Sequence, residues 1–92
     1  MYTIEETMNE IRDLEGWGDF VDQWDVADRT AIVWSEQAEN KHGSNPWRTI
    51  YIVRYWENDV WLDTKFFGEE WHASEFARDF VNGPHRLPYP TD

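Results

Sequence analysis

The chain has 92 residues, 19 of them acidic and eight basic, and a formal net charge of −11. This length suits one domain, and hydrophobic residues at 40% supply a core despite the charge. The absence of cysteine excludes disulfides, thiolate zinc sites and thiol nucleophiles. No apolar run reaches the length of a membrane span, and the acidic N-terminus lacks a signal-peptide pattern. We therefore expect a soluble protein in the cytoplasm, that of a host cell if a phage encodes it.

A first helix is predicted over residues 3–15. Thr3 and Glu6 have the spacing of a capping box, and Gly16 suits the position just past a helix end. The apolar stripe of this helix would consist of Ile4, Met8, Ile11 and Leu14. Its acidic residues lie off that stripe, as they would on a solvated face.

Residues 17–28 are ambiguous. Phe20 and Trp24 are four residues apart with Val21 between them, which favours a short helix capped by Asp19. An irregular loop is the alternative. In the helix, Asp22, Asp25 and Asp28 would project outward, and Asp19 would lie near the positive end of the helix dipole.

Three strands are predicted next, over residues 30–37, 47–57 and 60–67, with a loop over 40–46. Asn58-Asp59 suits a two-residue turn, because both residue types tolerate positive φ. That turn sets Trp56 opposite Trp61 and Arg54 opposite Asp63. One face then looks core-like and holds Tyr51, Val53, Tyr55, Val60, Leu62 and Phe66. The other face mixes apolar and charged groups, which suggests partial cover or a partner: Ile50, Ile52, Arg54, Trp56, Trp61, Asp63, Lys65 and Phe67.

A last helix is predicted over residues 70–82, with an apolar stripe of Phe76, Ala77, Phe80 and Val81. The proline-rich segment 83–92 is expected to be extended. The predicted fold is therefore α+β, in one domain over residues 1–92. It has an N-terminal helix, a three-stranded antiparallel meander and a C-terminal helix packed on the sheet.

The negative charge is concentrated in part of the chain. Residues 5–28 carry nine carboxylates and one base, Arg12, whereas residues 29–56 carry four bases and two acids. Self-repulsion destabilises a compact state, so a concentrated acidic surface suggests a basic partner. Acidity that only provides solubility is the simpler alternative. Adaptation to high salt fits less well, because the middle of the chain is not acidic.

Catalytic motifs are missing from the sequence. The serines have no motif context, there is no phosphate-binding glycine loop, and no carboxylate pair is marked as perturbed. His72, Glu75 and Asp79 share one helical face, but such a trio often arises by chance on an exposed helix. We expect neither an enzyme nor a bound cofactor or metal.

A binding function is the remaining expectation. Our preferred hypothesis is a small inhibitor whose carboxylates imitate nucleic-acid phosphates. It would occupy the nucleic-acid channel of a basic nucleic-acid-binding protein, such as a nuclease or a defence complex. In size, acidity and lack of a catalytic motif, the chain is similar to phage anti-defence proteins, including anti-CRISPR and anti-restriction proteins and inhibitors of uracil-DNA glycosylase. This likeness rests on size and composition. It includes no shared motif, so it assigns no role to any residue of this chain.

Two alternatives remain open. The chain could be an immunity protein that neutralises a basic nuclease toxin, or an adaptor domain that binds through an aromatic sheet face. Direct binding of nucleic acid is not expected, because phosphates repel an acidic protein, and no membrane contact is expected. The residues predicted to contact the partner are Glu10, Asp13, Trp17, Asp19, Asp22, Asp25, Asp28, Trp56 and Trp61.

Overall fold

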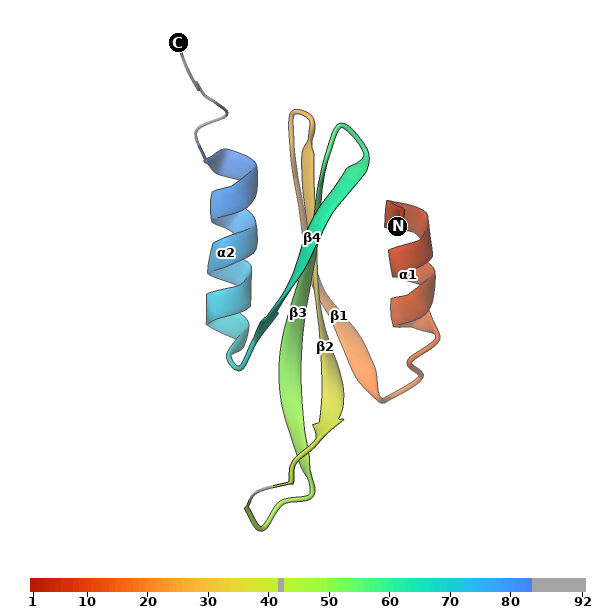
Figure 1. The fold of residues 1–92 in the computed structure, drawn as a ribbon, viewed down its shortest axis with the longest axis vertical. Coiled ribbons are helices and arrows are strands. Elements are labelled where there is room, and N and C mark those ends of the chain that lie inside the picture. The colour runs from red at the N-terminus through yellow and green to blue at the C-terminus, as the bar shows by residue number, and fades with distance from the viewer. Residues whose placement is uncertain (42, 84–92) are drawn as a thin grey trace.

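A four-stranded antiparallel sheet with one helix on each side organises residues 1–41 and 43–83, the part of the chain that the computed structural model describes (Figure 1). The elements are α1 (Ile4–Arg12), β1 (Gly18–Val26), β2 (Arg29–Glu39), β3 (Trp47–Glu57), β4 (Val60–Phe67) and α2 (Glu70–Asn82). The strand order is β1-β2-β3-β4, so each strand pairs with its neighbour in sequence. The α+β class with a helix at each end is confirmed, but the expected three-stranded sheet has four strands. Beyond Gly83, the segment that was predicted to be extended lies outside the described residues.

The start of α1 follows the predicted capping box. Thr3 Oγ1 accepts a hydrogen bond from Glu6 N at 3.0 Å, and Thr3 N donates to Glu6 Oε1 at 3.0 Å. The helix ends at Arg12, three residues before the predicted end. Glu15 (φ +46°) and Gly16 (φ +98°) then adopt left-handed conformations in the turn that leads to β1.

Residues 18–26 form an edge strand rather than the short helix or loop that was expected. A bulge explains the misleading spacing. Phe20 pairs with Trp34 and Asp22 with Val33, so Val21 is an extra residue in β1. Val21 and Trp24 therefore reach the same side of the sheet although they are three apart, which imitates the period of a helix.

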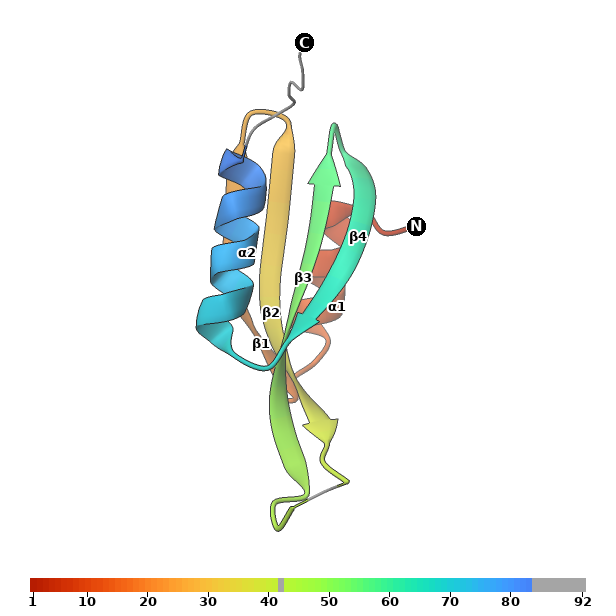
Figure 2. The same ribbon diagram turned by 60° about the vertical axis from the view of Figure 1, so that its left-hand side comes forward.

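The sheet has two apolar faces, and each is covered by one helix (Figure 2). On the α2 side the fully buried residues are Ala31, Val33, Val53, Ala73, Ala77 and Val81. On the α1 side the buried residues are Ile11, Ile32, Trp34, Ile52 and Trp56. Consecutive residues of β2 and β3 alternate between these two cores, as side chains on a pleated sheet must. The β2–β3 hairpin extends beyond both helices.

The β3–β4 hairpin has the predicted turn, with Asn58 at φ +54° and Asp59 at φ +63°. Trp56 pairs with Trp61, as predicted. The predicted pairing of Arg54 with Asp63 is wrong, because Leu62 is an extra residue that shifts the register by one. Arg54 instead faces Thr64, and Asp63 faces Tyr55.

That shift also exchanges the two faces of β4 beyond the bulge. Phe67 pairs with Tyr51 and packs in the core beneath α2, whereas it was assigned to the mixed face. Phe66 pairs with Ile52 on the α1 side and is 66% exposed, whereas it was expected in the core. Leu62 and Val60 are exposed as well.

Candidate interaction surface

The carboxylates of α1, of the connection that follows it and of β1 form one region, which we call the acidic flank. Its members are Glu5, Glu6, Glu10, Asp13, Glu15, Asp19, Asp22, Asp25 and Asp28. All are exposed except Asp22, which is half-buried. α1 contacts β1, so the two elements that carry most of these acids lie side by side (Figure 1).

The aspartates of β1 do not form a single row. Asp19 pairs with Ser35 on the α2 side, whereas Asp25 pairs with Thr30 on the α1 side, and Asp28 lies in the β1–β2 turn. A spacing of three residues changes the face of a regular strand, as it does from Asp22 to Asp25, whereas the bulge at Val21 keeps Asp22, which pairs with Val33, on the α2 side with Asp19. The predicted outward-facing set on a helix is therefore wrong, and these acids are spread over both sides of the sheet edge.

Asp22 and Asp25 also have roles within the strand. Asp25 accepts hydrogen bonds from Thr30 Oγ1 at 2.7 Å and from Gln23 Nε2 at 3.0 Å. Asp22 Oδ1 accepts from the backbone N–H of Gln23 at 2.8 Å. An asparagine side chain has one acceptor oxygen, so Asp22→Asn removes the charge and keeps the hydrogen bond, whereas Asp25→Asn keeps only one of its two.

A surface hollow lies on the acidic flank beside α1. Its lining includes Tyr2 and three acidic residues, Glu6, Glu10 and Asp13. The three acids are four and three residues apart, a spacing that places side chains on one helical face. This hollow brings Glu10 and Asp13 together, both of which the sequence assigned to the partner surface.

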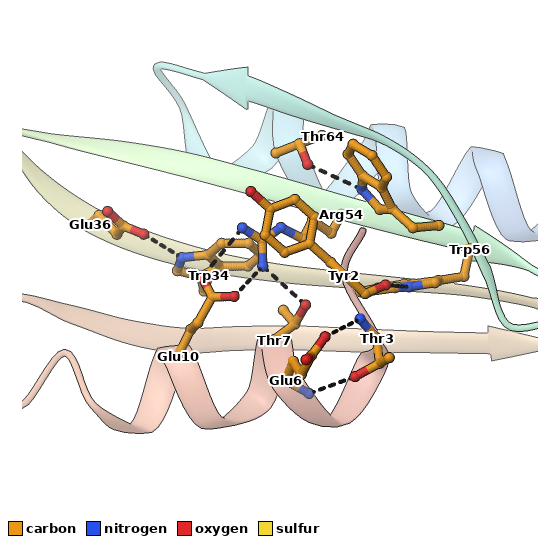
Figure 3. Close-up of polar contacts among 11 residues, drawn as sticks. Tyr2, Thr3, Glu6, Thr7, Glu10, Trp34, Glu36, Arg54, Trp56 and Thr64 are labelled. Atoms are coloured by element: carbon orange, nitrogen blue, oxygen red, sulfur yellow. Dashed lines mark hydrogen bonds and ion pairs between the residues drawn. The ribbon is translucent and has the colours of Figure 1, made fainter.

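Glu10 is also engaged within the protein (Figure 3). Arg54 Nη1 donates to Glu10 Oε2 at 2.9 Å, and Nη2 donates to Glu10 Oε1 at 3.3 Å. The same guanidinium donates to Thr7 Oγ1 at 3.0 Å, lies 3.5 Å from the ring centroid of Tyr2 and 5.0 Å from that of Trp34. Arg54 is thus a core residue that anchors α1 to the sheet, and Glu10 is not a free surface charge.

A second arginine of the middle strands points inward. Arg29 Nη1 donates to the carbonyl of Phe80 at 2.8 Å, and its Nε lies 3.6 Å from Glu57 Oε2. Of the four bases between residues 29 and 56, only Lys41 and Arg48 are therefore exposed, near the end of the β2–β3 hairpin. The surface of the middle strands is less basic than their sequence indicates.

The predicted aromatic sheet face is covered. Trp56 is 1% exposed, and its Nε1 donates to the carbonyl of Tyr2 at 2.8 Å. Trp61 is half-buried, packs edge-on against the Tyr2 ring at 5.1 Å and donates from Nε1 to Thr64 Oγ1 at 3.3 Å. α1 and the residues before it fill this face, so Trp56 stabilises the core and cannot contact a partner in this structure (Figure 3).

Trp17, which was predicted to contact the partner, is exposed, but it does not stand alone. Its ring packs edge-on against that of Trp47, with centroids 5.1 Å apart and 63° between the planes. Trp17 is 56% exposed and Trp47 44% exposed. The sequence showed Trp47 only as a tryptophan that begins a strand after a loop, and nothing in it connects that residue with Trp17.

Burial raises the pKa of the Tyr55 hydroxyl, and the nearby Asp63 adds to this, whereas Lys65 opposes it. The pKa of Asp63 is lowered, chiefly by a hydrogen bond from the backbone N–H of Thr64 and then by Lys65. Neither group belongs to the acidic flank.

The described residues, 1–41 and 43–83, lack a cluster of metal ligands and a helix that could span a bilayer. No three side chains of histidine or acidic residues there are placed to hold a metal ion. His72 instead stacks on Trp71 and packs against Phe67. Within the same residues, neither helix is long and apolar enough to span a bilayer. Comparison of the chain with protein-family models, curated proteins and solved structures gives no match.

Proposed function

We propose that the protein binds a basic nucleic-acid-binding protein and inhibits it by presenting the acidic flank where that partner receives nucleic-acid phosphates. The charge of the acidic flank is the observation that supports this most, because the flank gathers nine carboxylates, all exposed except the half-buried Asp22, with Arg12 as its one base. The proposal needs neither a catalytic residue nor a cofactor. It also fits a protein that does not bind nucleic acid itself, since phosphates repel an acidic surface.

The inward orientation of Arg29 and Arg54 supports the same function. Both guanidinium groups are held by partners within the fold, and of the nine flank carboxylates they neutralise Glu10 alone. The one base within the flank, Arg12, donates to Asn9 Oδ1 at 2.6 Å rather than to a carboxylate. A field of one sign steers an oppositely charged partner and raises the association rate at low ionic strength.

The test removes charge from the flank without changing its shape. The variant replaces Asp19, Asp22, Asp25 and Asp28 with asparagine, which changes the net charge from −11 to −7. The matched control removes four carboxylates from α2 and the residue before it, giving the same net charge. It carries Glu69→Gln, Glu70→Gln, Glu75→Gln and Asp79→Asn.

The measurement has two stages. Wild-type protein first captures its partner from the host lysate, and the purified partner is then titrated with each variant in competition with a labelled nucleic acid at two salt concentrations. We expect wild type and the α2 control to displace the nucleic acid, and the flank variant to be at least tenfold weaker. Truncating one member of a desolvated charge pair costs about 2–5 kcal/mol, and a rim pair far less, so a few central pairs suffice for this loss.

Equal weakening of the flank variant and the control would mean that net charge alone governs binding. Wild-type affinity in the flank variant at low salt would refute the proposal. A captured partner that is a toxin nuclease would identify the inhibitor as an immunity protein. Binding that hardly changes between the two salt concentrations would indicate an adaptor with an apolar interface.

A further inference from the structure

The Trp17–Trp47 pair is an aromatic surface that no other element of residues 1–41 and 43–83 covers. Trp47 lies on the same side of β3 as Val53, which packs beneath α2, because residues six apart on a strand share a face. The β2–β3 hairpin, however, continues past the end of α2 (Figure 1). The pair therefore lies on the α2 side of the sheet, in the part that the helix does not reach. Two half-exposed tryptophans that pack on each other contribute to the fold far less than buried ones.

The backbone holds both rings in place. Trp17 N donates to the Leu14 carbonyl at 2.9 Å, and the Trp17 carbonyl accepts from Gln37 N at 2.8 Å. On the other strand, Trp47 N donates to Asn45 Oδ1 at 3.1 Å. A surface whose backbone is already ordered loses little conformational entropy when it binds. Rigid tryptophans that can lose their remaining water contacts are typical anchors of protein interfaces.

Charges near the pair select the kind of side chain that fits it. Glu39 pairs with Trp47 across β2 and β3, and Asp19 lies two residues from Trp17 along the chain. Both acids are exposed. Both also belong to the α2 side, the side of Val33. Asp19 pairs with Ser35, which is two residues from Val33, and Glu39 is six residues beyond Val33 on β2. The exposed Arg48 follows Trp47 on β3 and therefore belongs to the α1 side, and Lys41 lies in the loop beyond β2. An aromatic surface whose own side carries carboxylates favours a cation that also has a flat, weakly hydrated face.

We propose that the Trp17–Trp47 pair receives an arginine side chain from a basic segment of the partner. This inference rests on the proposed function and adds the anchor contact of that interface. A guanidinium group can stack on an indole ring and donate hydrogen bonds to a neighbouring carboxylate at the same time. Lysine lacks the planar group, so arginine is bound more tightly than lysine at equal charge. The same contact is already used inside the protein, where the Arg54 guanidinium lies over Tyr2 and Trp34.

The probe is a short oligoarginine peptide, compared with oligolysine of the same length and with the uncharged citrulline analogue. Binding is followed through the indole N–H signals of 15N-labelled protein, with those of Trp17 and Trp47 assigned from the Trp17→Phe and Trp47→Phe variants. We expect oligoarginine to shift both signals in the wild type, oligolysine to shift them less and the citrulline peptide not at all. Binding in this arm is measured on the intact protein, and the two phenylalanine variants serve only to assign the signals.

The second arm measures affinity for oligoarginine in the Trp17→Ala/Trp47→Ala variant. We expect binding about fivefold to tenfold weaker, since a cation–π contact at a partly desolvated site is of that order. Phe66→Ala is the matched control, because Phe66 is 66% exposed and faces the α1 side, and it should bind as wild type.

The two proposals fail differently. If neither tryptophan signal moves with oligoarginine while the flank variant still loses affinity for its partner, the acidic flank is the interface and the tryptophan pair is not part of it. Equal shifts with oligolysine would show that charge alone brings the peptide there and would overturn the arginine assignment. Shifts with the citrulline peptide would show that the pair binds an apolar segment instead. Unchanged oligoarginine affinity in the double-alanine variant would overturn the arginine assignment, and it would leave the proposed function to the competition experiment with the flank variant.

Discussion

Arg54 of β3 and Glu10 of α1 form a two-pronged ion pair across a separation of 44 residues in the sequence. The pair is asymmetric, because the Arg54 side chain is 8% exposed and that of Glu10 is 49% exposed. If Arg54 is lost, the carboxylate can be hydrated. If Glu10 is lost, a buried guanidinium remains without its counter-charge.

The first prediction follows from this asymmetry. We expect Glu10→Ala to lower the free energy of unfolding by about 3 kcal/mol, because it leaves an uncompensated buried charge. Glu10→Gln should cost less, since its amide oxygen still accepts one hydrogen bond from the guanidinium. The measurement is urea denaturation, with Glu5→Ala as a control on the same helix. If Glu10→Ala costs no more than Glu5→Ala, Arg54 does not depend on Glu10.

The second prediction concerns the close approach at Gly18. A Cβ at this position would lie 2.2 Å from the carbonyl oxygen of Ser35 and 2.6 Å from Leu14 Cδ1. We expect Gly18→Ala to destabilise the protein by about 2 kcal/mol or more, because the obstructing oxygen belongs to a paired backbone. Gly68→Ala is the control, since nothing lies within 4 Å of its Cβ. Similar melting temperatures for the two variants would contradict this account.

The third prediction is a stabilising substitution. Ala27, in the β1–β2 turn, has φ +55°, a left-handed conformation that costs an L-residue about 1 kcal/mol. We expect Ala27→Gly to relieve this strain, and the higher entropy of glycine in the unfolded chain to offset part of the gain. The melting temperature should rise slightly, whereas Ala38→Gly, within β2, should lower it. A fall in both would show that the turn is unstrained.

The fourth prediction concerns alkaline pH. Because burial raises the pKa of Tyr55 above its ordinary value of about 10, the unfolded state releases this proton first as the pH rises. The contribution of Tyr55 to stability is therefore complete below about pH 10 and is lost progressively as the pH rises through the folded-state pKa. Tyr55→Phe should make stability fall less steeply above about pH 10. An unchanged slope would show that the hydroxyl is not desolvated.

Short-range chemistry was enough to predict several elements of this fold. The capping box at Thr3 and the turn at Asn58-Asp59 depend on residues next to one another, and both formed as expected. The two bulges could not be predicted from neighbouring residues in this way. Val21 and Leu62 are ordinary strand residues, and only the pairing with the neighbouring strand makes each of them an extra residue.

The candidate interaction surface was predictable only in part. The acidity of the flank is a property of composition, so it was visible in the sequence, whereas the sides to which its aspartates belong depend on the bulge at Val21. The burial of Trp56 depends on α1, whose docking is fixed by Arg54. Trp17 and Trp47 become neighbours only because β1 and β3 lie on either side of β2. Each of these outcomes is a tertiary effect that no local pattern encodes.

The meander order has a consequence for how the chain acquires its structure. Every strand pairs with one adjacent in sequence, so the sheet needs only short loop closures, a topology that favours rapid folding. During synthesis α1 and the first three strands leave the ribosome before α2 does. One core can therefore assemble early, while Ala31, Val33 and Val53 stay in contact with water until the last helix docks. Until α2 docks, the nascent protein has one sheet face covered by α1 and one apolar face that can associate with other apolar surfaces.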